Sequence, residues 1–122
     1  MRRSVLGLDI GGANLKAAHT SGSACVHPFE LWKAPSDLQK ALSDLFNIMP
    51  KSGLVAVTMT AELCDCFETK RQGVQAILDA VKIAAGTTPI LVWTTTGCFT
   101  NAEDAQANYL KTAAANWLAL AT

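Results

Sequence analysis

The sequence has little charge, and the charge that it has is balanced. Only 16% of its 122 residues are charged, and 10 Lys and Arg stand against 10 Asp and Glu. Binding to a nucleic-acid backbone or to an anionic membrane depends on an excess of positive charge, which this chain lacks. Long apolar runs are missing too, because glycine or a charged residue interrupts each one well before the ~18 residues of a membrane span. We therefore expect neither nucleic acid nor a membrane as a partner.

Features of a secretion signal are also missing. The apolar stretch after Arg3 reaches the charged Asp9 before it is long enough for a signal sequence, so we expect the protein in the cytoplasm. A chain of 122 residues can bury one core but not two full lobes, which excludes a complete two-domain enzyme. The helical pattern at residues 117–122 has no Gly, Pro or polar cap. This favours one N-terminal lobe, residues 1–122, of a larger protein.

The cysteines do not follow a metal-binding or redox pattern. Cys64 and Cys66 are separated by one residue instead of two, and no second pair accompanies them. His19 and His27 are the only histidines, so we expect no zinc site. In a chain without a secretion signal, the cysteines are expected to be reduced and buried.

The periodicity of apolar residues predicts an α/β fold. Strands are expected over residues 4–10, 15–20, 24–32, 54–59 and 89–93, and helices over 36–49, 69–86 and 102–117. Ser36 is expected to cap the first helix and Pro50 to end it. The continuous apolar runs at 54–59 and 89–93 are typical of strands covered on both faces. A three-strand meander followed by β-α crossovers onto a mixed sheet indicates a ribonuclease H-like lobe, the unit found in actin, Hsp70 and sugar kinases.

The turn after the first strand carries the sharpest chemical signal. Asp9 ends a buried strand, and Gly11 and Gly12 allow the backbone to approach a phosphate closely. Asn14 and Lys16 can bind or neutralise the same anion. The motif resembles the first phosphate motif of the actin, Hsp70 and sugar kinase superfamily, which implies that Asp9 holds Mg²⁺ directly or through water.

Two other interpretations of this turn remain open. A dinucleotide-binding fingerprint needs a third glycine and a helix there, but Leu15 occupies that position and a strand follows. The simplest alternative is a structural Gly-Gly hairpin in which Asp9 is only a turn residue.

A second segment resembles a narrower family. Residues 57–67, VTMTAELCDCF, and the GV at 73–74 are similar to the pattern MTGEL.D.F....EGV of hydantoinase A and oxoprolinase relatives. Residues 9–18 and 114–117 also match the branch of this family linked to tetrahydromethanopterin-dependent C1 transfer and methanofuran synthesis. Ala61 replaces the usual glycine of the pattern.

This resemblance implies a transferase that uses Mg²⁺ with a nucleotide or an organic diphosphate and acts on a small phosphorylated substrate. Family members carry a second acidic, glycine-rich turn further along the chain, so this chain alone is expected to be inactive. A separate C-terminal lobe or a second copy is the expected partner. Two alternatives stay open: a non-catalytic module that oligomerises or binds a partner, and the hydrolysis of a cyclic amide.

Further polar residues follow the buried strands at their carboxyl ends, where ligands gather in open α/β sheets. Thr60 and Glu62 follow one strand, and Thr95 and Gly97 follow the next. Glu62 is a candidate catalytic residue, and the other three are candidates for cofactor binding. Asp65 could assist Glu62 or stabilise a helix N-terminus.

The remaining polar and aromatic residues have simpler structural interpretations. Lys70 and Arg71 could meet a phosphate, although adjacent cations at a helix start usually form a solvated surface. His19 and His27 are expected to be structural. The three tryptophans are expected in the core or at a lobe interface: Trp32, Trp93 and Trp117.

Overall fold

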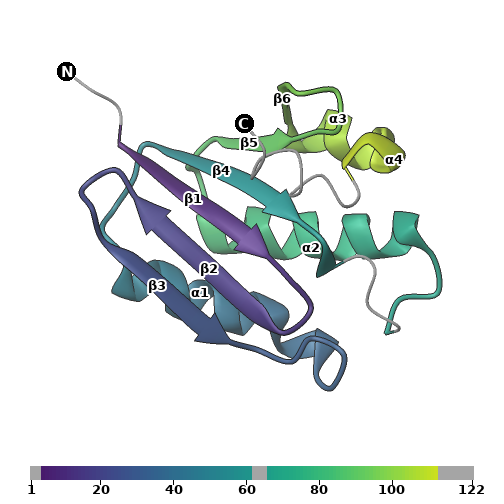
Figure 1. Cartoon of the computed structure of the whole chain (residues 1–122), viewed down its shortest axis with the longest axis horizontal. Coiled ribbons are helices and arrows are strands. Elements are labelled where there is room, and N and C mark those ends of the chain that lie inside the picture. The colour runs from purple at the N-terminus through teal and green to yellow at the C-terminus, as the bar shows by residue number, and fades with distance from the viewer. Residues whose placement is uncertain (1–3, 62–65, 113–122) are drawn as a thin grey trace.

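A six-stranded mixed sheet is the framework of the computed structural model, which describes residues 4–61 and 66–112 (Figure 1). The strands are β1 (Val5–Ile10), β2 (Asn14–His19), β3 (Ala24–Pro28), β4 (Leu54–Met59), β5 (Ile90–Trp93) and β6 (Phe99–Asn101). Their order across the sheet is β3-β2-β1-β4-β5-β6. β1, β4 and β5 run parallel, whereas β2 is antiparallel to both of its neighbours and β6 to β5. The predicted meander and the two parallel strands beside it are confirmed.

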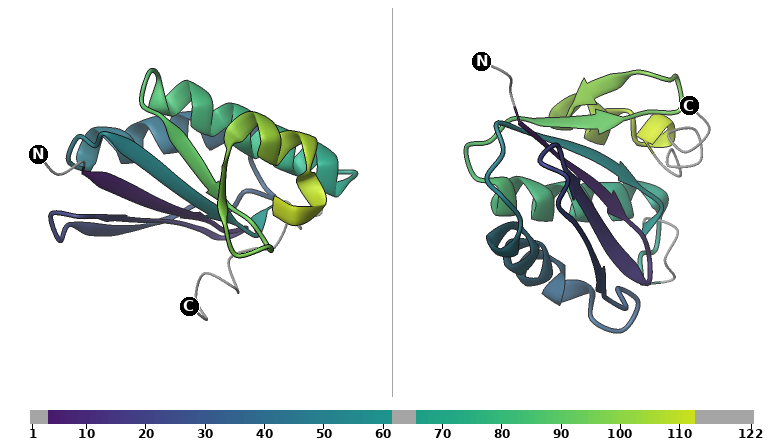
Figure 2. Two further views of the ribbon diagram at one scale, coloured as in Figure 1. Left: turned by 90° about the horizontal axis from the view of Figure 1, so that it is seen from above. Right: turned by 60° about the vertical axis from the view of Figure 1, so that its left-hand side comes forward.

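The helices lie on one side of this sheet, as the two views in Figure 2 show. They are α1 (Leu38–Ile48), α2 (Lys70–Ala85), α3 (Ala102–Ala107) and α4 (Tyr109–Thr112), with a short 3₁₀ turn η1 (Pro35–Asp37) before α1. α3 and α4 pack against α2. No helix in residues 4–61 and 66–112 is long and apolar enough to cross a membrane.

The helix ends confirm one predicted signal and correct another. The Thr69 hydroxyl accepts a hydrogen bond from the Gln72 N–H at 3.0 Å, which caps α2, and Gly86 ends that helix with a φ of 61°. Ser36 does not cap α1, because it lies inside η1 and the helix begins only after Asp37. Pro35 favours this tight first turn, which displaces the helix start.

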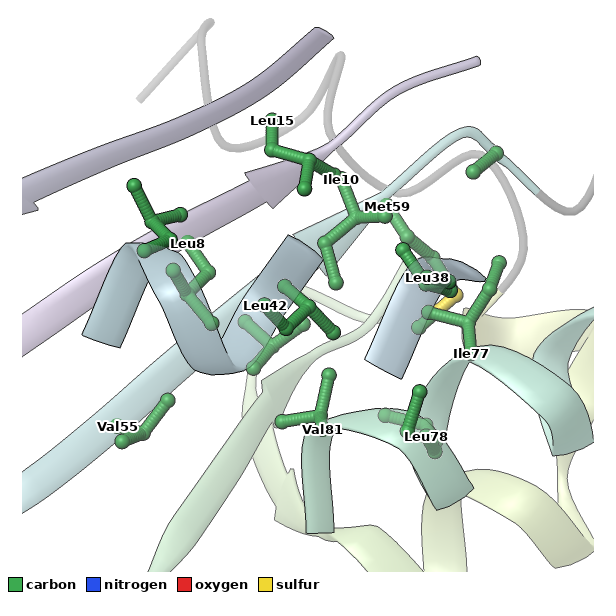
Figure 3. Packing of buried hydrophobic residues seen from close by; sticks show 14 of the residues in the cluster. Leu8, Ile10, Leu15, Leu38, Leu42, Val55, Met59, Ile77, Leu78 and Val81 are labelled. Carbon is green, nitrogen blue, oxygen red and sulfur yellow. The ribbon is translucent and has the colours of Figure 1, made fainter. Parts of the chain in front are cut away.

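One hydrophobic core lies between the sheet and the helices (Figure 3). Its apolar side chains alternate along the strands, so that every second residue faces α1 and α2. The sheet contributes Leu6, Leu8, Ile10, Leu15, Val55, Val57, Met59 and Val92, and the helices contribute Leu38, Leu42, Leu45, Val74, Ile77, Leu78 and Val81. The apolar periodicity of the first two predicted helices is confirmed by this burial.

The other face of the sheet has no helix over it within the described residues, and Figure 1 looks onto it. Leu54, Ala56 and Thr58 are half-buried there, whereas their neighbours in β4 are buried. Within residues 4–61 and 66–112, helices therefore cover β4 and β5 on one face, and cover on both faces stays a prediction. We call this surface, made by alternate residues of the strands, the open face.

The region after β5 also differs from the prediction. Residues 99–101 form the extra edge strand β6, which three residues are too few to signal in a sequence. The expected helix 102–117 is broken at Asn108 into α3 and α4, and its residues 113–117 lie outside the described residues. Cys98 is exposed rather than buried. The expected strand 24–32 ends at Pro28, although the Phe29 and Leu31 N–H groups still donate to carbonyls of the β1–β2 turn.

Candidate functional site

Polar side chains line up across the open face near the carboxyl ends of β1 and β4. Asp9 pairs with Lys16 of β2 on one side and with Thr58 of β4 on the other. Since Val57 pairs with Val92, Trp93 is the neighbour of Thr58, and it pairs in turn with Phe99. The sheet register thus places a cation, a carboxylate, a hydroxyl and two aromatic rings in one row, which we call the polar-aromatic row.

The turn from β1 to β2 is held firmly in place beside this row. The Gly11 N–H donates to the Asn14 carbonyl at 3.0 Å, and the Leu31 N–H donates to the Gly12 carbonyl at 3.0 Å. The Phe29 N–H also donates to the carbonyl of Ala13 at 3.0 Å. These bonds fix a glycine turn before any ligand arrives, which lowers the entropic cost of binding.

The two glycines of the turn play different parts. A Cβ added at Gly11 would lie 3.3 Å from the Asn14 carbonyl and 3.9 Å from the Thr60 hydroxyl, so that position is tight. A Cβ at Gly12 would meet nothing within 4 Å. Neither glycine has a positive φ. Gly12 is therefore not required by the fold, and the space in front of it is open to a ligand.

Most of the predicted site residues come together in space. Asp9, Asn14 and Lys16 lie on the open face, and Gly11 lies against Thr60, whose N–H donates to the Ile10 carbonyl at 3.0 Å. Glu62 and Asp65 lie outside the described residues.

Thr95 and Gly97 belong to the β5–β6 connection, on the far side of β4 from the glycine turn. The Thr95 N–H is bonded to the Lys111 carbonyl, and Gly97 has a φ of 80°. The connection is held by its own bonds, including Thr94 Oγ1 to the Cys98 carbonyl at 2.8 Å. These two residues share the sheet edge with Asp9 but do not contact the glycine turn.

The histidines and the cations of α2 take positions away from this turn. His19 Nδ1 accepts from the Ser21 N–H at 3.0 Å and Nε2 lies 3.1 Å from the Lys51 carbonyl, so the ring links two loops at the opposite end of β1. His27 is half-buried on β3. Lys70 and Arg71 are exposed at the start of α2.

Trp32 does not lie in the core, so the interface alternative stays a prediction. It is 55% exposed, and the Lys33 ammonium lies 4.8 Å from the centre of its ring. Trp117 lies outside the described residues.

The described residues do not gather a full set of protein metal ligands around Asp9. No group of three or more His, Cys, Asp or Glu side chains gathers in residues 4–61 and 66–112. Mg²⁺ is commonly bound by one or two carboxylates together with substrate phosphates and water. Asp9 is half-buried and lies three residues before Gly12, so it fits such a site better than one built from protein ligands alone.

Sequence reasoning missed the other half of the polar-aromatic row. A cavity of about 630 Å³ lies on the open face, and Asp9, Lys16, Thr58, Trp93 and Phe99 are among its lining residues. The only available signal was the alternation in β4, where Ala56 and Thr58 interrupt a run of larger apolar residues. Nothing local in the sequence joins Thr58 to Phe99.

Comparisons with known proteins agree on the family. The hydantoinase/oxoprolinase family model matches residues 54–122, which is more than half of the chain. The chain is 40% identical over 124 aligned residues to a Methanocaldococcus jannaschii protein named (4-{4-[2-(gamma-L-glutamylamino)ethyl]phenoxymethyl}furan-2-yl)methanamine synthase. This alignment covers 99% of the chain and 36% of the relative, so the chain spans about a third of that protein's length. It includes the Asp9 turn, which precedes the matched part of the family model. The chain belongs to the hydantoinase/oxoprolinase family.

Proposed function

We propose that this chain forms the phosphate-binding part of a Mg²⁺-dependent transferase in methanofuran-linked one-carbon metabolism. The observation that carries the proposal is the juxtaposition of Asp9, the fixed glycine turn and Lys16 on one open face. The name of the 40% identical relative, a synthase of a furan methanamine, supports the pathway. The activity itself belongs to a longer protein, since the chain spans 36% of that relative.

The strand arrangement supports a ribonuclease H-like lobe of the actin type. In this proposal the antiparallel meander β1–β3 carries the first phosphate motif, and β4 and β5 extend the sheet parallel to β1. α1 and α2 follow the β3 and β4 strands and return the chain across the same face. Such a lobe leaves the carboxyl ends of β1, β4 and β5 at one edge, where open α/β sheets bind their ligands.

Each residue of the site has a defined part in this proposal. Asp9 would hold Mg²⁺. The bound ion would neutralise the negative charge of the phosphate as the leaving group departs. Gly11 and Gly12 would present backbone to a phosphate group, and Asn14 would donate to it from its side-chain amide. Lys16 would offset the negative charge that develops on the leaving group.

Three further candidates would border the same ligand. Thr60 lies against Gly11 and would contact the phosphate through its hydroxyl. Thr95 and Gly97, beyond β4, would contact the other end of a nucleotide or an organic diphosphate. Glu62, two residues after Thr60 in the sequence, would act as a catalytic residue.

Calorimetric titration tests the phosphate site directly. The chain is titrated with Mg²⁺ plus pyrophosphate and, separately, with Mg²⁺ plus ATP, which distinguishes a bare diphosphate site from a nucleotide site. Asp9→Asn is expected to abolish Mg²⁺-dependent binding, because the amide keeps the size of the carboxylate but loses its charge. Asp44→Asn is the matched control, since Asp44 is an exposed residue of α1 paired only with Lys40 among the described residues. Failure of the unmodified chain to bind either ligand, or undiminished binding by Asp9→Asn, refutes the proposal.

The open face supports a second candidate function, a non-catalytic module that pairs with a second copy or a separate lobe. Val26 on edge strand β3 is 59% exposed and Phe99 on edge strand β6 is 49% exposed. Exposed apolar surface of this kind often marks an interface. Light scattering coupled to size-exclusion chromatography tests it, and a strictly monomeric chain that binds Mg²⁺-pyrophosphate contradicts it.

A further inference from the structure

The open face carries an apolar surface that no helix of residues 4–61 and 66–112 covers. Gly7, Ala18 and Ala56 lie side by side on β1, β2 and β4 and form the floor of the cavity of about 630 Å³. Trp93 and Phe99 line one wall of it, with their ring centroids 4.9 Å apart. Phe99 is 49% exposed. Because apolar surface gains stability when it is removed from water, this part of the face favours a covering group.

One buried polar atom in the wall constrains what can cover this surface. The indole nitrogen Nε1 of Trp93 has no hydrogen-bond partner in the described part of the chain. An indole N–H can only donate, and a buried donor without an acceptor loses its hydration without compensation. The cover must therefore be mainly apolar and must bring one acceptor to Trp93.

The chain leaves its last described helix at the rim of this surface. The Lys111 carbonyl accepts a hydrogen bond from the Thr95 N–H, two residues beyond Trp93. Thr112, the end of α4, is fully buried and lines a small cavity together with Phe99. Figure 1 shows α4 close to the β5–β6 hairpin. The chain therefore continues from a point next to the aromatic wall.

The sequence that follows, AAANWLALAT at 113–122, has the composition that such a cover needs. It contains no charged residue, and Asn116 is its one side-chain amide, whose oxygen can accept from an indole N–H. Alanines allow a close approach to the sheet, and the large ring of Trp117 complements the small floor residues.

The length of this segment also matches the face. A helix of ten residues would span ~15 Å. The strands β5, β4, β1 and β2 are neighbours in the sheet, and three strand spacings of ~4.8 Å give nearly the same width. The segment can thus reach from the aromatic wall across the whole floor.

We propose that residues 113–122 dock on the open face. Trp117 lies over the small floor residues, and the Asn116 side-chain oxygen accepts from Trp93 Nε1. This contact supplies the acceptor that the indole N–H lacks, while the apolar side chains of the segment bury the wall and the floor. The segment thereby covers the surface that the second candidate function assigns to another copy or a separate lobe.

The covalent link favours this occupant over a separate molecule. A segment joined directly to Thr112 is present at the face at an effective concentration of about millimolar. A second copy or a separate lobe must instead overcome the full entropic cost of association. Gly7 of the floor lies four residues before Gly11, so the docked segment leaves the glycine turn accessible. The docking therefore does not depend on Mg²⁺ or on phosphate binding.

Nuclear magnetic resonance of the full chain tests the docking directly. With ¹³C-labelled alanine methyl groups, nuclear Overhauser contacts are expected between the Trp117 ring, assigned with Trp117→Phe, and the methyl groups of Ala18 and Ala56. A mixture of labelled and unlabelled chains distinguishes contacts within one chain from contacts between two copies. The ring of Trp32, which is exposed and does not line the cavity, is the internal control and should show no contact to these methyl groups.

An asparagine pair tests the polar contact. Asn116→Ala is expected to speed hydrogen exchange of the Trp93 indole N–H about tenfold, the effect of one lost hydrogen bond. Asn47→Ala, at an exposed position of α1, is the matched control and should leave this rate unchanged.

An alanine pair tests the floor. Ala18→Glu places a charge at an exposed position of the floor and is expected to abolish the contacts between Trp117 and Ala56. Ala107→Glu, on the exposed side of α3, should preserve them. Unchanged signals of the buried methyl groups show that each variant is folded.

The outcomes identify what covers the face. Contacts of Trp117 with the floor within one chain, lost in Ala18→Glu, support the docking. Their absence from the unmodified chain overturns it, and so do contacts that arise only between two copies, which assign the face to a dimer. An indole exchange rate that Asn116→Ala leaves unchanged also overturns the proposal, because Trp93 then has another partner or none. Pyrophosphate titration of the same sample tests the proposed function separately, and neither result decides the other.

Discussion

The two faces of the sheet are built from alternate residues of the same strands, yet they differ in chemistry. On the covered face, Leu8, Val57 and Met59 are at most 3% exposed and pack against helices. On the open face, Asp9 and Thr58 of the same strands line a cavity. Stability is therefore concentrated on one face, and the residues suited to binding are concentrated on the other. The contrast implies that substitutions on the two faces have separable effects on folding and binding.

The largest expected effect is a loss of stability on the covered face. Met59 is fully buried between the sheet and the helices. Met59→Ala is expected to lower the free energy of unfolding by about 2–5 kcal/mol, because it removes buried apolar atoms and leaves a cavity. Urea denaturation followed by circular dichroism measures this loss. A decrease below about 0.5 kcal/mol, the size of a typical surface substitution, would show that the covered face does not hold the fold.

A smaller loss is expected at the start of α2, which forms much of the cover. Thr69→Ala removes the hydroxyl that accepts from the Gln72 N–H, and about 1 kcal/mol of stability should be lost. Ser36→Ala is the control, because Ser36 does not cap α1 and its loss should be close to neutral. The same urea series measures both variants. If both variants lost the same free energy of unfolding, the assignment of Thr69, and not Ser36, as a helix cap would be contradicted.

Gly12 gives a test in which binding and stability separate. Gly12→Ala should leave stability unchanged or raise it by up to about 1 kcal/mol, since the added methyl meets nothing and glycine's unfolded-state entropy is reduced. It should weaken Mg²⁺-pyrophosphate binding, because the methyl occupies the space proposed for phosphate. Gly11→Ala provides the contrast, since its methyl lies 3.3 Å from the Asn14 carbonyl and should cost stability as well. Calorimetry and urea denaturation on both variants measure the two quantities. Full pyrophosphate binding by Gly12→Ala would contradict the phosphate site.

The sequence predicted the covered face better than the open one, for a physical reason. The core positions of α1 and α2 repeat at helical spacing, so a short window contains the whole signal. The Asp9 turn could be predicted for the same reason, because Asp9, Gly11, Gly12 and Lys16 lie within eight residues. Whether helices cover the open face depends on which segments of the chain cross it. No local sequence pattern contains that information.

The polar-aromatic row shows where prediction from the sequence ends. Lys16, Thr58 and Phe99 are separated by about 40 residues each, and only the pairing register brings them into one line. β6 itself has three residues, too few for a period-two signal. A motif that is contiguous in sequence can thus be found before the structure, whereas a site assembled by register cannot.

The smallest expected effect on stability concerns the residue next to Met59. Thr58→Val replaces a buried hydroxyl that has no partner in the described part of the chain with a methyl group of nearly the same shape. Since no hydrogen bond is lost and the desolvation of an unpaired group is relieved, the free energy of unfolding should stay within about 0.5 kcal/mol or rise. Urea denaturation of Thr58→Val and of Met59→Ala compares the free energies of unfolding for two adjacent residues on opposite faces of one strand. A loss above about 1 kcal/mol would contradict this expectation and show that the hydroxyl stabilises the fold.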